Sequence, residues 1–462
     1  MYLRSISAIF LIGFTLQSAE PAKRPLVAPS PPMGWNSYDA YDSNINEAEF
    51  KANVDVMARD LKAYGWQYAV IDFLWYNSVL GTPADPQRKA NPDLKLDAAG
   101  KPLQQLTMDG YGRLTPSENR FPSAAHGAGF KPIADYVHAK GLKFGIHIMR
   151  GIPRQAYFAK LPVLDTKVTA HDIADTDSAC SWLNYMYGVD STKPGAQAYY
   201  DSLFRLYASW GVDFVKVDDL SATVYHADEL ELIHNAILKC GRPIVLSLSP
   251  GETPMGRARH VAANAQMWRI SGDFWDNWPA LLHTFDLLNA WSPFIGNGIW
   301  PDGDMLPIGH VGMRRHVVGP DRQSRFSWPE HYTLMTLWSI ARSPLMIGAD
   351  LVSSSAQSLA FLKNKEVLDV NQHSAHNRQV SRTKNDAVWL AEVPGSKTQY
   401  LALFNLTDVR RKVSLHLNDE ALRGRFAVRD LWAHKDLGVM QIDIAAELEA
   451  HGAALYRLTP VR

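Results

Sequence analysis

The stretch DFVKVDDLS, residues 213–221, starts as an apolar run and ends in charged residues. Its alternation predicts a buried β-strand whose polar end leaves the sheet. Lys216 and Asp218 are two positions apart, so their side chains point to one face of this strand, and Asp219 points to the other. A nearby ammonium group keeps a carboxyl group ionised, as a nucleophile requires. The alternative is a structural ion pair at a strand end.

Seven further runs of this kind alternate with amphipathic stretches that are typical of helices, several of which end in glycine. This alternation predicts an α/β fold, a (β/α)₈ TIM barrel over residues 30–368. A doubly wound sheet is the alternative, but no glycine-rich phosphate loop follows the first run. The other seven predicted strands are residues 31–37, 66–72, 142–148, 243–249, 266–271, 293–300 and 343–350.

Polar residues end several of the predicted strands. In a (β/α)₈ barrel the carboxyl ends of the strands surround one active-site mouth. We therefore expect these side chains to converge there: Asp72, His147, Asp218, Ser249, and Ser271 leading into Asp273.

A second acidic motif, WRISGDFWDNW at residues 268–278, places Asp273 and Asp276 among three tryptophans. A carboxyl group beside aromatic rings is desolvated, which raises its pKa and suits it to donate a proton at neutral pH. We expect this role for Asp273, whereas Asp276 is expected to cap the helix that starts near Asn277. Carboxylates at the ends of strands four and six can face each other across a barrel mouth, as glycoside hydrolysis requires.

Two segments differ from the predicted barrel in their sequence pattern and composition. Residues 372–462 consist of short alternating runs separated by turn residues, which predicts a C-terminal antiparallel β-domain, a β-sandwich. Residues 77–123 form a long insertion, rich in Pro, Gly and Asp, on the mouth side of the barrel.

The composition favours a neutral ligand. Lys+Arg 47 balance Asp+Glu 47, so no basic footprint for nucleic acid or an anionic membrane exists, and Trp 14 supplies flat faces that suit sugars. Residues 1–19 resemble a signal peptide, so we expect export to the periplasm or the extracellular space, with no membrane association afterwards. Cys180 and Cys240 are too few for a metal cluster, and the sequence leaves open whether they pair.

Six segments resemble glycoside hydrolase family 27, the α-galactosidase and α-N-acetylgalactosaminidase (melibiase-like) family. They are PPMGWNSY (31–38), ADYVHAKGLKFGI (134–146), WGVDFVKVDD (210–219), WRISGDFWDNW (268–278), PDGDMLPIG (301–309) and LWSIARSPLMIGADL (337–351). The resemblance implies the barrel with its C-terminal β-domain, and hydrolysis with retention at the anomeric carbon. It implies no metal and no organic cofactor.

The resemblance also implies roles for individual residues. The nucleophile falls on Asp218 and the acid/base on Asp273. The sugar-binding positions of the family fall on Lys216, Arg269, Asp304, Met305 and, as an aromatic platform that is often Trp, Tyr38. Asp72 matches the first acid of a pair that binds the galactose 4- and 6-hydroxyl groups.

The sequence departs from the family pattern at three positions. Phe73 replaces the second acid of that pair, which puts an apolar ring near the sugar C6. Ser249 stands where galactose-specific members carry a Glu that reads the 2-hydroxyl group, and N-acetylgalactosaminidases also use Ser there. Leu220 replaces a disulfide-forming Cys, so the site needs another brace.

His147 stands where relatives often have a pocket-lining Tyr, and either binds substrate or is a satisfied strand-end histidine.

The sequence therefore predicts a retaining exo-glycosidase that hydrolyses terminal α-galactosidic linkages of oligo- or polysaccharides by double displacement. The alternatives within the family are an α-N-acetylgalactosaminidase and a β-L-arabinopyranosidase, whose sugar has the galactose configuration without C6. A non-catalytic carbohydrate-binding relative is the alternative from another class. An outer sugar subsite at Trp182, Tyr185 and Tyr187 competes with simple packing of these rings. The sequence predicts no oligomeric state.

Overall fold

The structure is a computed structural model of the chain. It describes residues 26–78, 95–103, 106–314, 319–417 and 422–461. The predicted signal peptide, residues 1–19, lies outside the described residues, as does part of the insertion 77–123.

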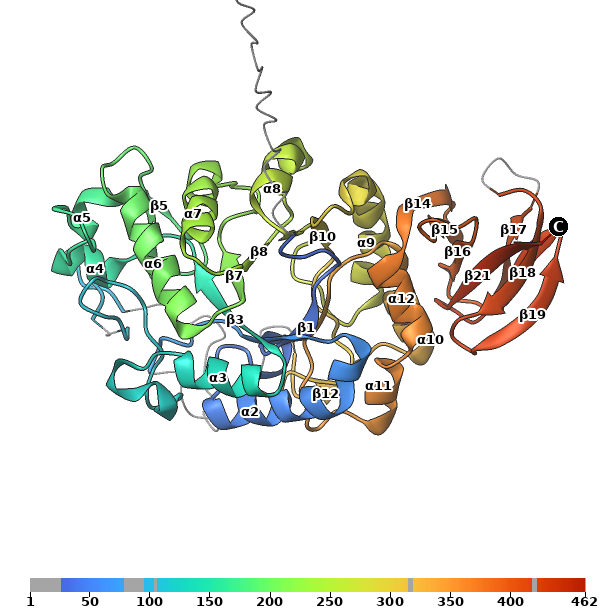
Figure 1. The fold of residues 1–462 in the computed structure, drawn as a ribbon, viewed down its shortest axis with the longest axis horizontal. Helices are drawn as coiled ribbons and strands as arrows, with labels where there is room; N and C mark the ends of the chain where they lie inside the picture. The colour runs from blue at the N-terminus through green and yellow to red at the C-terminus, as the bar shows by residue number, and fades with distance from the viewer. Residues whose placement is uncertain (1–25, 79–94, 104–105, 315–318, 418–421, 462) are drawn as a thin grey trace, which may run out of the picture.

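Eight parallel strands form one curved sheet in the order β10-β9-β8-β7-β3-β2-β1-β13. The chain therefore contributes its first and last barrel strands, β1 and β13, as neighbours within this sheet. Helices surround the sheet in Figure 1. The strands are β1 Met33–Asn36, β2 Tyr68–Ile71, β3 Lys143–Met149, β7 Phe214–Asp218, β8 Val245–Leu248, β9 Met267–Arg269, β10 Trp300–Asp302 and β13 Leu345–Ile347.

A short bridge closes the sheet into a barrel. Leu306, just after β10, pairs in parallel with Ile347 of β13. The Leu306 amide donates to the Met346 carbonyl at 2.7 Å, and the Gly348 amide donates to the Leu306 carbonyl at 3.0 Å. This confirms the predicted (β/α)₈ barrel.

One predicted strand is misplaced. Residues 293–300 were expected to be a strand, but a 3₁₀ turn occupies Ser292–Phe294 and a tight turn follows, with a bridge between Gly296 and Ile299. Gly296 and Gly298 adopt positive φ angles, which a regular strand does not allow. The strand itself starts only at Trp300.

The predicted helices form where the sequence caps them. Asn46 and Glu49 make a reciprocal capping box at the start of α2, and Gly211 ends α6 in a left-handed conformation. The helices are α1 Tyr38–Tyr41, α2 Glu47–Val56, α3 Lys131–Ala139, α4 Arg154–Ala159, α5 Ala170–Ile173, α6 Ala196–Trp210, α7 Ala227–Lys239, α8 Ala258–Asn264, α9 Trp278–Trp291, α10 Trp328–Ile340, α11 Ala356–Phe361 and α12 Lys365–His373.

Small sheets decorate the loops. After β3 the chain forms a three-stranded sheet from β4 Ile152–Pro153, β5 Ala174–Ala179 and β6 Met186–Val189, with β6 in the middle. A second pair, β11 His310–Val311 and β12 Arg322–Gln323, follows β10.

The C-terminal domain is antiparallel, as predicted, and lies beside the barrel at the red end of the chain in Figure 1. Six strands form a sheet in the order β14-β15-β16-β21-β18-β19, and β17 pairs with β20. Val388 and Leu390 of β15 share one apolar core with Val413 and Leu415 of β17, so the two sheets form a sandwich. The strands are β14 Ala375–Arg382, β15 Asp386–Glu392, β16 Gln399–Asn405, β17 Arg411–His416, β18 Arg425–Asp430, β19 Lys435–Met440, β20 Asp443–Leu448 and β21 Ala453–Val461.

Aromatic rings join the domains. Phe361 of α11 stacks on Trp432, with ring centroids 5.0 Å apart, and the Trp432 indole donates to the Thr336 hydroxyl of α10 at 2.9 Å. Cys180 and Cys240 are both free thiols, which answers the question that the sequence left open. Among the described residues, every helix is too short or too polar to span a bilayer.

Candidate active site

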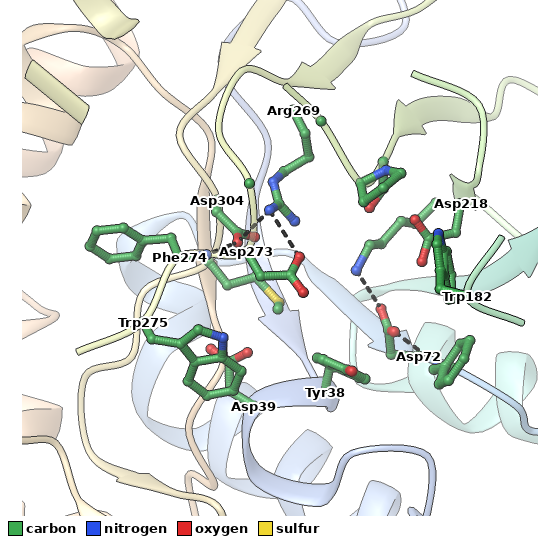
Figure 2. Close-up of a pocket in the computed structure, with 17 residues that line it drawn as sticks. Tyr38, Asp39, Asp72, Trp182, Asp218, Arg269, Asp273, Phe274, Trp275 and Asp304 are labelled. Carbon is green, nitrogen blue, oxygen red and sulfur yellow. Dashed lines mark hydrogen bonds and ion pairs between the residues drawn. The ribbon is translucent and has the colours of Figure 1, made fainter. Parts of the chain in front are cut away.

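The predicted site residues converge on a cavity of about 350 Å³ at the carboxyl ends of the barrel strands (Figure 2). All of them line it except His147. The cavity is also lined by Asp39, Phe274 and Trp275, which were not predicted to bind sugar, and by Trp182 of the suggested outer subsite.

Asp218, at the end of β7, presents a nearly buried carboxylate to this cavity. His147 Nε2 lies 3.1 Å from its Oδ2 atom, and the Asp219 amide donates to Oδ1 at 3.3 Å. Burial by itself raises the pKa of Asp218, but the hydrogen bond and charge of His147 and the charge of Lys216 outweigh it and lower the pKa below its usual value. Asp218 is therefore held ionised.

His147 lies behind the nucleophile position rather than in the cavity lining. Its side chain is fully buried, and Phe73 packs edge-on against its ring at 5.3 Å. A carboxylate only accepts hydrogen bonds, so the contact with Asp218 makes Nε2 the donor. His147 therefore contacts Asp218 and does not face the cavity in which a substrate would bind.

Asp72, after β2, forms a buried ion pair with Lys216 at 3.1 Å. Asn36 Nδ2 also donates to Asp72 at 2.6 Å, and the Phe73 amide donates at 2.9 Å. Burial opposes ionisation, but the charges of Lys216 and His147 and these two bonds lower the pKa of Asp72 to about 2. The charge of Asp72 in turn raises the pKa of Lys216.

Asn36 was missed by sequence reasoning, although its position signals its role. It ends the first barrel strand, next to the strand that carries Asp72. A polar residue at that point of the run predicts a place at the mouth.

Arg269, at the end of β9, joins the remaining acids. Its Nη2 atom lies 2.8 Å from Asp304 Oδ2 and 3.2 Å from Asp273 Oδ1 (Figure 2). Burial raises the pKa of Asp304, while Arg269 opposes the rise. The Phe274 amide also donates to Asp304 at 2.8 Å, which fixes that carboxyl group.

The expected desolvation of Asp273 by tryptophans is wrong. Its side chain is 61% exposed. The chain bends at residues 271–273, directly after β9, and the carboxyl group lines the cavity while it stays open to solvent. An exposed acid/base group can exchange protons with solvent between two half-reactions.

The expected helix cap at Asp276 is also wrong. Asn277 caps α9, because its side chain accepts from the Ala280 amide at 3.0 Å. Asp276 is buried instead and binds Arg322, with Nη2 to Oδ1 at 2.5 Å. This ion pair ties the segment that carries Asp273 to β12.

An apolar wall faces the polar groups. The ring of Phe73 lies 6.0 Å from Tyr38 and 6.1 Å from Trp182. Tyr185 and Tyr187 are buried and do not line the cavity, so only Trp182 of the suggested outer subsite reaches it. Ser249 contributes a small side chain to the lining.

A buried ionic network supports the strand end behind Asp218. Arg150 binds Asp219 through Nη2 at 2.8 Å and also pairs with Glu229. Its Nε atom donates to the Asp219 carbonyl at 2.8 Å, and its amide donates to the Asp218 carbonyl at 3.0 Å. Asp219 is thus a structural residue, as its strand face predicted, and this network braces the place where Leu220 excludes a disulfide.

The cavity combines two carboxyl groups with different surroundings. Asp218 is nearly buried and held ionised, whereas Asp273 is exposed beside Arg269. A nucleophile and a proton donor at one pocket are the groups that cleavage of a glycosidic bond requires. The Asp72 and Lys216 pair places charged groups at the cavity that can hydrogen-bond the hydroxyl groups of a ligand. The described residues hold no cluster of three or more His, Cys, Asp or Glu arranged to bind a metal ion.

Two family models match the chain. Residues 186–373 match the model for alpha galactosidase A, and residues 383–458 match the alpha galactosidase C-terminal beta sandwich domain.

Solved structures are similar over almost the whole chain. A family GH27 β-L-arabinopyranosidase from Geobacillus stearothermophilus, solved with arabinose, is 48% identical, with a TM-score of 0.88 and 94% of this chain and 98% of that chain covered. A protein from Bacillus halodurans, described as a putative alpha-N-acetylgalactosaminidase, is 43% identical, with a TM-score of 0.80 and coverage of 93% and 97%. An alpha-galactosidase of Cyamopsis tetragonoloba is 27% identical over 439 residues, which cover 93% of this chain and 86% of the relative.

Proposed function

The chain belongs to glycoside hydrolase family 27 and is a glycoside hydrolase, and from this premise we propose that it removes terminal α-galactosidic residues from carbohydrates with retention. The observation that carries the proposal is the ionised Asp218 and the exposed Asp273 on one cavity, beside the Asp72 and Lys216 pair. The predicted family and enzyme class are confirmed, and the α-galactosidases among the relatives support the predicted linkage.

The mechanism follows from the chemistry of the two acids. Asp218 attacks the anomeric carbon while Asp273 protonates the leaving oxygen, and a covalent glycosyl-enzyme forms. Asp273, then a carboxylate, takes a proton from water, which attacks the anomeric carbon and releases Asp218. The exposure of Asp273 supports this second step, since water reaches that side of the cavity.

The charged groups beside Asp218 select the sugar. Asp72 is ionised at neutral pH and accepts hydrogen bonds from sugar hydroxyl groups, while Lys216 and Arg269 donate to them. Asp304 and Met305 complete the wall beside Arg269, and Tyr38 offers an aromatic face. A small pocket of about 350 Å³ with such groups around it suits a terminal sugar, which supports an exo-acting enzyme.

A second candidate substrate, a β-L-arabinopyranoside, is favoured by Phe73. Its ring packs against Tyr38, His147 and Trp182, so an apolar surface stands directly after Asp72. A sugar without a C6 hydroxymethyl group leaves no hydroxyl unpaired against this surface. The β-L-arabinopyranosidase that is 48% identical to this chain supports the same candidate.

Ser249 favours a third candidate substrate, an α-N-acetylgalactosaminide. Its short side chain leaves room for an N-acetyl group at the sugar C2, and the relative from Bacillus halodurans carries that activity in its description. The same position therefore separates α-N-acetylgalactosaminides from α-galactosides.

The deciding experiment is kinetics on nitrophenyl α-galactoside, β-L-arabinopyranoside and α-N-acetylgalactosaminide, for the wild type and for Phe73→Asp and Ser249→Glu. We expect Phe73→Asp to shift the ratio of kcat/KM toward the α-galactoside, because a carboxylate near C6 accepts from its 6-hydroxyl group. An unchanged ratio in both variants would refute the assigned pocket positions.

The catalytic proposal has its own test. Asp218→Asn removes the nucleophile at almost constant size, so we expect hydrolysis to fall by at least about 10⁴-fold while sugar binding by calorimetry remains. Hydrolysis by Asp218→Asn at the wild-type rate would contradict the mechanism. A wild type that binds sugars without cleaving any of the three glycosides would instead match a non-catalytic relative.

The location of the enzyme is a separate proposal. The signal-like segment at residues 1–19 supports export to the periplasm or the extracellular space. Expression of the full chain, followed by fractionation and N-terminal sequencing, tests it. An uncleaved chain that stays in the cytoplasmic fraction would refute it.

A further inference from the structure

One carboxyl group of the cavity has no role in the mechanism above. Asp39 follows Tyr38 in α1 and is 1% exposed, yet it lines the cavity together with Asp304 and Trp275. Figure 2 shows it on the side of Tyr38 and Trp275, away from Asp72. Asp39 follows the first barrel strand and packs against Gly348, directly after the last barrel strand, so it lies in the part of the wall between these two strands.

The last barrel strand makes room for this carboxyl group. Strand β13 is followed by Gly348, and a Cβ atom on Gly348 would lie 1.9 Å from Asp39 Oδ2 and 2.4 Å from its Cγ. Any side chain at position 348 would therefore displace Asp39. While other strands present polar side chains to the cavity, β13 presents none at this point, and Asp39 occupies the space.

Asp39 lacks the partners that a buried acid normally has. Its Oδ2 atom is buried, and no group of the described residues forms a hydrogen bond with it. Burial raises the pKa of Asp39 well above its usual value, and the charges of Asp304 and Asp273 add to the rise. A buried polar group without a partner destabilises the folded protein, so folding alone does not explain this residue.

Asp350 shows what a structural acid looks like nearby. It is also 1% exposed and also follows β13, but it accepts from the Tyr41 hydroxyl at 2.5 Å and from Asn53 Nδ2 at 3.0 Å. The Ser353 amide donates to it as well, at 2.8 Å. Asp350 is fully bonded within the protein, whereas Asp39 is not.

We propose that Asp39 is a substrate-contacting residue whose carboxyl group hydrogen-bonds a hydroxyl group of the carbohydrate in the cavity. The inference rests on the proposed function, because it takes the ligand to be a sugar. The bonding hydroxyl belongs either to the sugar that Asp218 attacks or to the leaving sugar beside Asp273. A hydroxyl group of either sugar would form the same hydrogen bond. The test therefore compares two substrates that differ only in the leaving group.

The test measures kcat/KM for Asp39→Leu and Asp39→Asn on two substrates with the glycone that the wild type prefers. One is the nitrophenyl glycoside, whose leaving group carries no hydroxyl substituent, and the other is the corresponding disaccharide. We expect Asp39→Leu to lower kcat/KM at least 10-fold, on both substrates if Asp39 binds the glycone and on the disaccharide alone if it binds the leaving sugar. Asp39→Asn keeps size and hydrogen-bonding atoms and should lose less than Asp39→Leu.

Thermal melting separates this role from a structural one. Asp39→Leu and Asp39→Asn should melt at or above the wild-type temperature, because each removes a buried carboxyl group without partners. The control Asp350→Asn should melt lower, with unchanged kcat/KM per folded molecule. Wild-type kcat/KM on both substrates in Asp39→Leu and Asp39→Asn, or a lowered melting temperature in Asp39→Asn, would overturn the proposal. A wild type inactive on all glycosides would refute the proposed function instead.

Discussion

The ammonium group of Lys216 lies 3.1 Å from Asp72 Oδ2, and Lys216 shares one face of β7 with Asp218. One cation therefore serves two carboxylates that stand on different strands. It lowers the pKa of both Asp72 and Asp218, so Asp72, which we propose to bind the sugar, and Asp218, the proposed nucleophile, are kept ionised together. Changes at this pair should affect stability as well as activity.

We expect Asp72→Asn to lose activity and stability together. The substitution removes the ion-pair partner of the buried Lys216 ammonium group and leaves only the charge of Asp218 near it. Breaking such a buried pair costs about 3–5 kcal/mol in the free energy of unfolding. The substitution also removes a charge-assisted bond to the sugar, worth about a 10²-fold loss of kcat/KM. Urea unfolding and steady-state kinetics check both. The double variant Asp72→Asn, Lys216→Met should regain stability but not activity; equal stability of the two variants would contradict the argument.

The Asp72 carboxyl group should also shape the acid limb of the stability curve. Its pKa is about 2 in the folded protein, against a usual value of 3.8. A lowered folded-state pKa gives stability that is complete above about pH 4 and is lost as the pH falls through the folded-state pKa, here about 2 kcal/mol. Between pH 5 and pH 2, the free energy of unfolding should decrease less for Asp72→Asn than for the wild type. Parallel curves would show that Asp72 is not the group responsible.

His147→Phe should move the acid limb of the pH–activity profile upward. Among the groups that lower the pKa of Asp218 against the effect of burial, His147 has the strongest influence, so its removal raises that pKa. The nucleophile must be ionised, hence activity disappears at a higher pH than in the wild type, with about a 10-fold loss at the optimum. His147→Gln keeps a donor and should be intermediate. An unshifted profile in His147→Phe would show that the bond is irrelevant, and His416→Gln, in the β-sandwich, serves as control.

Arg150→Met should destabilise the protein without touching the cavity. The buried Glu229 and the half-buried Asp219 lose their common cation, which costs about 3–5 kcal/mol in the free energy of unfolding. Burial raises the pKa of both acids and Arg150 opposes the rise, so both become protonated more easily in the variant. Calorimetric melting near pH 7 checks the loss. Adding Glu229→Gln to Arg150→Met should restore part of the lost stability. If Arg150→Met alone were as stable as the wild type, the Arg150 network would not support the strand end behind Asp218.

Much of this site could be read from the sequence because barrel strands are regular. The side-chain period of a strand placed Lys216 and Asp218 on one face and Asp219 on the other, and the structure has them so. The family motifs placed Arg269, Asp304 and Met305 at the mouth, where they line the cavity. Local rules suffice where a residue's surroundings are its own strand and the next one.

The errors arose where long-range contacts decide. Asp276 follows a common capping pattern, but Arg322, 46 residues away, binds it. Asp273 has tryptophans beside it in sequence, yet the turn after β9 directs it outward. Arg150 and Asp39 gave no signal, because the first finds its partners directly after β7 and on α7, and the second depends on the missing side chain of Gly348.

The closure between β10 and β13 sets a limit on how uniformly the barrel is held together. Neighbouring strands elsewhere pair over two to five registered positions, whereas this closure consists of the bridge between Leu306 and Ile347. Amide hydrogen exchange should therefore be fastest, among barrel strands, at Leu306 and Gly348. Asp304 and Met305 lie just before Leu306, and Asp39 packs against Gly348, so these cavity residues lie on both sides of the closure. A bound sugar that contacts both sides should therefore slow exchange at the closure and stabilise this part of the barrel wall.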